Sequence, residues 1–233
     1  MKKISMESLN RMTALVIGKA GIGKTSLLRT IPEGEKVCVL SAESGLLCVR
    51  DLVLSGKVEG FEIANFDELR QSLNFFQSGQ GNEYQWIFID SLTEIAARCV
   101  ESVKEKYINS KDTFKMWGEY NDILTKIIKD FRDMTTHSVV FTCLPSIEKD
   151  EENRRYIGPS MSGSQLKERL TSYFDEVFYM VPHESGPRIF ITQPDDQRIP
   201  AKDRSGKLNS IEKPDLGWIK NKIMRGENSN GSN

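Results

Sequence analysis

The stretch that decides the fold is Gly18-Lys19-Ala20-Gly21-Ile22-Gly23-Lys24-Thr25. The apolar run before it predicts a buried strand over Thr13–Ile17, and a helix is expected from Lys24 to about Thr30. Glycines allow consecutive backbone N–H groups to turn inward around an anion. The start of the following helix adds the positive end of its dipole. The stretch therefore predicts an anion-binding turn between a strand and a helix.

The spacing of this turn matches the pattern GxxxxGK[ST], the P-loop or Walker A motif. In this motif the lysine reaches the β- and γ-phosphates, and the hydroxyl residue binds magnesium. A chance match in a chain of this length is expected roughly once in a hundred. The motif therefore predicts ATP and Mg²⁺ as cofactors, with Lys24 acting on the phosphates and Thr25 on the metal. The predicted nucleotide-binding residues are Gly18, Lys19, Ala20, Gly21, Ile22, Gly23, Lys24, Thr25, Ser26 and Thr142.

Apolar runs and amphipathic patterns alternate along the chain, which predicts an α/β fold with a mostly parallel central sheet flanked by helices. Strands are expected at 36–40, 85–90, 138–144, 176–181 and 188–192, and helices at 67–77, 92–103, 117–131 and 165–174. Residues 46–60 fit neither pattern clearly. The segment Ser146–Ser164 is polar and is predicted to be a long loop. We expect one domain over residues 1–225 and a disordered tail over 226–233.

Two acidic residues lie at or just beyond the carboxyl ends of predicted strands. Asp90 ends the run Trp86-Ile87-Phe88-Ile89-Asp90, where a carboxylate beside the P-loop can hold the magnesium shell, directly or through water. Its alternative role is to cap the helix that starts at Leu92. Glu43 comes just after the strand 36–40 and can serve as the base for ATP hydrolysis. Its alternative is an exposed carboxylate on a loop.

The bulk composition limits the possible partners. The net charge is −1 and the pI is about 6.2, so any contact with DNA must be local rather than a bulk attraction. No run approaches the roughly 18 apolar residues that cross a bilayer, and Met1–Met12 lacks the apolar core of a secretory signal. We therefore expect a cytoplasmic protein without a membrane partner. Its cysteines are expected to be buried free thiols: Cys38, Cys48, Cys99 and Cys143.

Three segments give the chain a resemblance to the RecA family, and in particular to the small RecA-like ATPases that bacteriophages encode beside single-strand annealing and recombination functions. Val37–Glu43 resembles the RecA strand that ends in its catalytic glutamate, and Ile87–Ser91 resembles the magnesium strand. Ala201–Leu208 is similar to a segment typical of the phage ATPases. The resemblance implies a RecA-like core, ATP hydrolysis, single-stranded DNA as a partner, and location in the host cytoplasm. It also implies a homo-oligomer, either a ring or a filament, with shared ATP sites. The protein partners that it suggests are a single-strand binding protein or other recombination proteins.

The same resemblance suggests further site residues. RecA relatives receive cations from the neighbouring subunit, which here implies Lys202 and Arg204 as catalytic residues. Their DNA-binding loops correspond to Asn109–Thr113 and Ser146–Ser164. The second loop offers cations and an aromatic ring for single-stranded DNA, namely Lys149, Arg154, Arg155 and Tyr156. Its acidic residues leave a solvated, mobile segment as the alternative.

One departure from the family concerns the strand 138–144. Relatives follow it with an Asn-Gln pair that senses the γ-phosphate, whereas this chain has Phe141-Thr142-Cys143-Leu144. Thr142 can supply one polar contact, but the glutamine is missing, which puts coupling between ATP and DNA in question.

Other functions remain open from the sequence. One is a P-loop kinase of a small molecule, with the charged segment Lys149–Arg155 as a lid. Another is an ATP-dependent loader of replication proteins with negligible turnover. A switch GTPase is disfavoured, because the only Asn-Lys pair, Asn221-Lys222, lacks the aspartate that guanine readers place two residues later.

Overall fold

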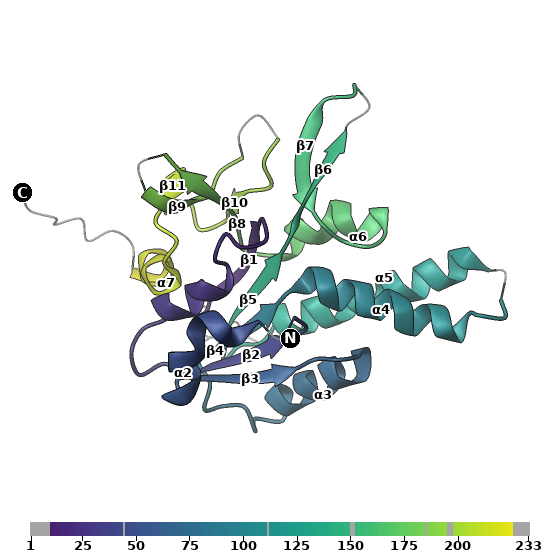
Figure 1. Ribbon diagram of the computed structural model, residues 1–233, viewed down its shortest axis with the longest axis horizontal. Helices are drawn as coiled ribbons and strands as arrows, with labels where there is room; N and C mark the ends of the chain where they lie inside the picture. Colours follow the sequence, from purple (N-terminus) through teal and green to yellow (C-terminus); the bar gives the residue numbers. More distant parts are fainter. Residues whose placement is uncertain are drawn as a thin grey trace, which may run out of the picture.

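The structure is a computed structural model and describes residues 10–43, 45–110, 112–149, 152–184, 186–194 and 198–225. The strands are β1 (Thr13–Gly18), β2 (Val37–Ser41), β3 (Val58–Glu62), β4 (Trp86–Asp90), β5 (Ser138–Cys143), β6 (Pro145–Lys149), β7 (Arg155–Pro159), β8 (Glu176–His183), β9 (Gly186–Ile191), β10 (Lys202–Asp203) and β11 (Ile211–Glu212). The helices are η1 (Thr25–Thr30), η2 (Leu46–Val49), α2 (Arg50–Leu54), α3 (Phe66–Gln77), α4 (Leu92–Lys106), α5 (Thr113–Arg132), α6 (Ser164–Arg169), η3 (Leu170–Tyr173) and α7 (Leu216–Arg225). Figure 1 labels most of them along the chain.

Within these residues, a nine-stranded sheet has the order β11-β9-β8-β1-β5-β4-β2-β3, with β10 added beside β8. The six strands from β8 to β3 run parallel, whereas β9, β10 and β11 pair antiparallel. Every residue of β1, β2, β4 and β5 is buried, as expected for central parallel strands covered on both faces. Strand β5 lies between β1 and β4.

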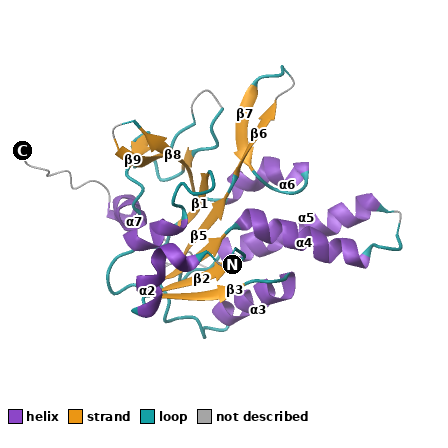
Figure 2. Cartoon of the chain, viewed as in Figure 1, coloured by secondary structure: helices purple, strands orange, loops and turns teal. Residues whose placement is uncertain are grey.

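Helices cover both faces of this sheet (Figures 1 and 2). On one face, alternate strand residues such as Leu15 and Phe141 pack with the apolar sides of α3, α4, α5 and α6. On the other face, their neighbours such as Val16 and Val140 pack with η1 and α7. This alternation follows from the two-residue period of a strand. The prediction of an α/β fold with a mostly parallel sheet flanked by helices is confirmed.

The segment Ser146–Ser164 corrects one prediction, because it is not a long loop. Strands β6 and β7 pair antiparallel into a hairpin that projects from the body of the molecule (Figure 1), and α6 begins at Ser164. The turn of the hairpin includes Asn153 at φ 61°, a left-handed backbone position that asparagine tolerates better than most residues.

Other local predictions need smaller corrections. The helix after the P-loop is a six-residue 3₁₀ helix, and the helix predicted over 165–174 divides into α6 and η3. Residues 46–60 form η2, α2 and the start of β3. Cys38, Cys99 and Cys143 are buried as expected, but Cys48 is exposed. The predicted tail, 226–233, lies outside the described residues.

Candidate nucleotide-binding site

The carboxyl ends of the parallel strands meet at one edge of the sheet, where ligands bind in many open α/β folds. The register pairs Ile17 with Cys143 and Ser41 with Asp90, so the P-loop, Asp90 and the residues after β2 emerge side by side. Topology therefore brings together at one edge the polar residues that were predicted separately from the ends of four strands.

Asp90 is the centre of this edge. Its Oδ2 accepts a hydrogen bond of 2.6 Å from the Thr25 hydroxyl, and its Oδ1 accepts one of 2.5 Å from the Thr142 hydroxyl. Asp90 is 5% exposed and Thr142 is fully buried, so strands β4 and β5 fix the carboxylate against the P-loop. This set of oxygens suits magnesium, which prefers hard oxygen ligands and binds through one or two protein groups.

Lys24 is folded against its own loop. Its Nζ donates to the carbonyl oxygens of Gly18 at 2.8 Å and Lys19 at 3.1 Å, and the residue is only 8% exposed. Burial lowers the pKa of Lys24, while the negative charges of Asp90 and Glu43 act in the opposite direction. The ammonium is thus held at the mouth of the loop, in a position to exchange carbonyl contacts for phosphate oxygens.

Glu43 lies two residues beyond β2 and is exposed, so a reactant can reach it. One of its oxygens, Oε1, accepts a short hydrogen bond from the Ser91 hydroxyl, and the peptide bond between Asp90 and Ser91 is cis.

Ser91 also caps α4, because its hydroxyl accepts from the backbone N–H of Glu94 at 3.4 Å. The capping role considered for Asp90 therefore belongs to Ser91.

Arg188 is a residue of this site that the sequence did not suggest. It lies on β9, and its Nη1 donates a hydrogen bond of 2.7 Å to the carbonyl oxygen of Ile22 inside the P-loop. Gly23 has φ +98°, a backbone conformation that other residues rarely adopt, and a Cβ there would lie 1.6 Å from Arg188 Nη1, so the guanidinium would have to move. The only sequence signal was a cation near the start of a strand, which is too common to single out.

Lys202 and Arg204 lie away from the P-loop of their own chain. Lys202 pairs with Val177 near the amino end of β8, whereas the P-loop follows the carboxyl end of the neighbouring β1. Lys202 Nζ donates to the Phe174 carbonyl at 2.6 Å, and Arg204 pairs with Asp175 at 2.8 Å. The two side chains reach adjacent residues, as expected for positions i and i+2 of an extended segment. Their role across a subunit interface stays a prediction.

The predicted DNA-binding residues lie on the β6–β7 hairpin but divide between its two faces. Lys149 is opposite Arg155, while Tyr156 is opposite Glu148 on the other face. Glu148 forms an ion pair with Lys167 of α6, so that face packs toward the body. Arg154 lies in the turn and pairs with Glu152 at 2.9 Å. The structure thus brings Lys149 and Arg155 together and separates them from Tyr156.

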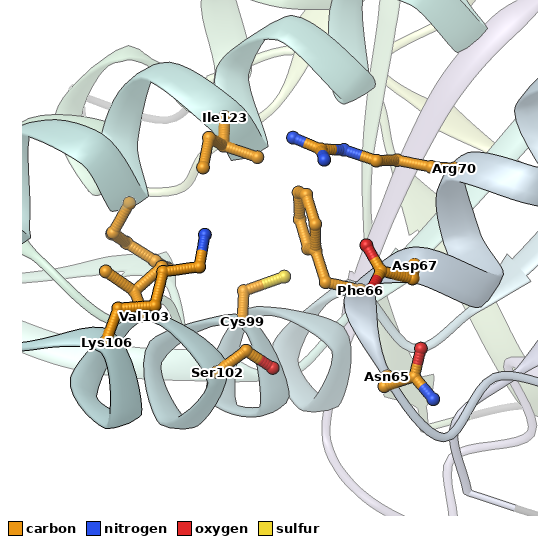
Figure 3. A pocket seen from close by; sticks show the side chains of 10 residues that line it. Asn65, Phe66, Asp67, Arg70, Cys99, Ser102, Val103, Lys106 and Ile123 are labelled. Atoms are coloured by element: carbon orange, nitrogen blue, oxygen red, sulfur yellow. The ribbon is translucent and has the colours of Figure 1, made fainter.

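A cavity of about 90 Å³ lies between α3, α4 and α5 (Figure 3). The Cys99 sulfur and the Lys106 amino group point into it. Lys106 also pairs with Glu119 at 3.0 Å, and the Arg70 guanidinium lies 4.9 Å from the centre of the Phe66 ring. None of the residues predicted to bind nucleotide lines this cavity, so we do not include it in the site.

No helix in the described part of the chain is long and apolar enough to cross a membrane.

Comparison with known proteins identifies the family of this chain. No curated protein sequence matches this chain. Among solved structures, the crystal structure of the RadB recombinase is similar at 14% identity, covering 77% of this chain and 79% of that chain, with a TM-score of 0.47. The family model described as an AAA domain matches residues 10–205, which is most of the chain and includes the P-loop, Glu43 and Asp90. The chain therefore belongs to the AAA domain family.

Proposed function

We propose that the protein is a magnesium-dependent ATPase of the RecA-like kind, which binds ATP at Gly18–Thr25 and hydrolyses it. The observation that carries the proposal is the hydrogen-bonded group of Thr25, Asp90 and Thr142 beside Lys24, with Glu43 at the same edge. A P-loop needs a magnesium-binding carboxylate and a base, and both residue types are present at the expected strand ends.

The chain's own residues would divide the work as follows. The backbone of the P-loop and Lys24 would bind the phosphates. Thr25 and Asp90 would hold Mg²⁺, which would neutralise phosphate charge. Ser91 donates a hydrogen bond to Glu43 Oε1 and so orients the carboxylate. The other oxygen, Oε2, would then accept a proton from the attacking water. Thr142 would act through Asp90, because its buried hydroxyl donates to that carboxylate.

We further propose that the protein acts on single-stranded DNA in recombination or annealing, as the phage-encoded ATPases of this kind do in the host cytoplasm. The hairpin face that carries Ile147, Lys149 and Arg155 supports this proposal. Ile147 is 73% exposed there, and exposed Lys149 and Arg155 stand next to it along the strands. Cations that follow a phosphate backbone beside an apolar contact for bases suit a single strand. An oligomer that shares ATP sites through Lys202 and Arg204, and a single-strand binding protein as partner, belong to the same proposal.

The test is ATP turnover, measured as phosphate release with and without single-stranded DNA, for the wild type and Lys24→Ala. We expect magnesium-dependent turnover that DNA stimulates and that Lys24→Ala abolishes. Turnover without DNA stimulation would leave the ATPase and reject the DNA role. Phosphoryl transfer to an added metabolite would favour a kinase instead, and tight ATP binding with negligible turnover would favour a loader.

A further inference from the structure

The carbonyl oxygens of the P-loop need hydrogen-bond donors, and one of these donors comes from outside the motif. When the N–H groups of such a loop turn toward an anion, its carbonyl oxygens turn away and need other donors. Lys24 donates hydrogen bonds to the carbonyl oxygens of Gly18 and Lys19. Arg188 donates one to the carbonyl oxygen of Ile22. The loop is therefore held by one cation of its own and one from β9.

The contact with Arg188 is built into the packing. Its guanidinium lies against the backbone of Gly23, where a Cβ would come within 1.6 Å of Nη1 and 2.7 Å of Cζ. Gly18 packs against Met180 of β8, the partner strand of β9. The β8–β9 hairpin thus meets both ends of the glycine-rich turn. A side chain at Gly23 would strain its positive φ and would also displace the Arg188 guanidinium.

We propose that Arg188 is a positioning residue of the nucleotide site, which braces the P-loop through Ile22 and thereby keeps its N–H groups in the arrangement that binds phosphate. The inference rests on the proposed nucleotide binding. Arg188 acts from within the same chain, unlike the cations proposed to come from a neighbouring subunit. Because it supports the loop and does not read the γ-phosphate, its loss should affect ATP and ADP alike.

The experiment is calorimetric titration of Mg-ATP and Mg-ADP into the wild type, Arg188→Ala and Arg188→Lys. The matched control is Arg70→Ala, which removes an arginine from α3, outside the site. We expect Arg188→Ala to weaken both nucleotides about tenfold or more, the usual worth of a hydrogen bond to a charged group. Arg188→Lys should recover part of this loss, because an ammonium can still donate to the Ile22 carbonyl. Arg70→Ala should bind as the wild type does.

The outcomes separate this inference from the proposed function. If the wild type binds neither nucleotide, the proposed function itself fails. If the wild type binds and Arg188→Ala binds equally well, the brace is rejected. A loss confined to ATP would reject it too, since it would place Arg188 on the γ-phosphate. Melting temperatures without nucleotide test a merely structural role: if Arg188→Ala melts lower and Arg188→Lys binds no better, Arg188 is an ordinary packing residue.

Discussion

The Thr25 hydroxyl and the Asp90 carboxylate, 65 residues apart in the chain, are joined by a hydrogen bond of 2.6 Å. The bond ties the end of the P-loop to the end of β4 across the intervening strand β5. Thr142 of β5 closes the gap by donating to the other oxygen of the same carboxylate. One buried carboxylate therefore fixes three strands at the edge where the proposed chemistry takes place.

Asp90→Asn should remove the magnesium dependence of ATP binding. The amide keeps the shape of the side chain but loses the charge that favours a divalent cation. Affinity for ATP, measured with Mg²⁺ and with a chelator, should differ in the wild type and be equal in the variant. Asp130→Asn, at a surface ion pair on α5, is the matched control. An undiminished effect of Mg²⁺ in Asp90→Asn would show that the metal binds elsewhere.

Glu43→Gln should leave ATP affinity within about twofold and slow turnover by about 10² to 10⁴, the usual contribution of a general base. The amide can still accept from Ser91, so the local geometry is kept while the basicity is lost. Phosphate release and nucleotide titration on the same preparation measure both quantities. Turnover equal to that of the wild type would make Glu43 a bystander.

Lys149→Ala combined with Arg155→Ala should weaken binding to single-stranded DNA and flatten its salt dependence. Each lost phosphate contact lowers the slope of log K against log salt by about 0.7, so the pair should lower it by about 1.4. Fluorescence anisotropy with a labelled oligonucleotide over a salt series measures the slope. The control pair is Lys36→Ala with Lys126→Ala, two exposed lysines outside the hairpin. Equal slopes in the hairpin variant and the wild type would place the DNA elsewhere.

Lys202→Ala with Arg204→Ala should be inactive alone and partly active when mixed with Lys24→Ala. In a shared site, some mixed interfaces pair an intact P-loop with intact cations, and an arginine in this role is worth about 10³ to 10⁵ in rate. Each variant must first be shown to keep its fold, because Lys202 and Arg204 also contact Phe174 and Asp175. Mixtures that demonstrably co-assemble but recover no phosphate release would exclude a role across the interface.

Glu176 predicts how stability depends on pH. It is 2% exposed, and burial, followed by the nearby charge of Asp203, raises its pKa from 4.5 to about 8. The folded state therefore binds more protons than the unfolded state between these values, and stability should fall as pH rises through this window. Glu176→Gln should remove that fall and raise the melting temperature at about pH 8. Thermal melts between about pH 5 and pH 8 measure it, with Glu168→Gln, an exposed carboxyl on α6, as control. Parallel curves for Glu176→Gln and the wild type would contradict the assignment.

The parts of the fold that the sequence predicted share one physical cause. Strands β1, β2, β4 and β5 are buried on both faces, so they require uninterrupted apolar runs, and such runs are visible without any knowledge of pairing. A polar residue directly after such a run, as at Asp90, then marks the edge where ligands bind. The position of Glu43 followed from the same reasoning, whereas Thr142 was suggested by the resemblance to RecA relatives and lies inside β5.

The sequence did not predict the hairpin or the role of Arg188, for different reasons. Strands β6 and β7 carry a weak local signal, in which Ile147 and Ile157 alternate with polar residues, but each strand is only five residues long. Arg188 has no local signal, because its contact with Ile22 spans 166 residues and depends on the pairing of β8 with β9. An irregularity in that pairing between Val181 and His183 shifts the register just before Arg188, and a pattern of residue types cannot predict such a shift.

The one exposed cysteine gives the native chain a ready-made attachment point for a reporter dye. Burial raises the pKa of Cys38 and Cys99 to about 12 and that of Cys143 to about 11, so these thiols stay protonated and shielded at neutral pH. A maleimide should therefore attach to Cys48, whose carbonyl oxygen accepts a hydrogen bond of 2.7 Å from Arg29 in the helix that follows the P-loop. Fluorescence from that single position would follow movement of this helix during a reaction cycle, without any engineered cysteine.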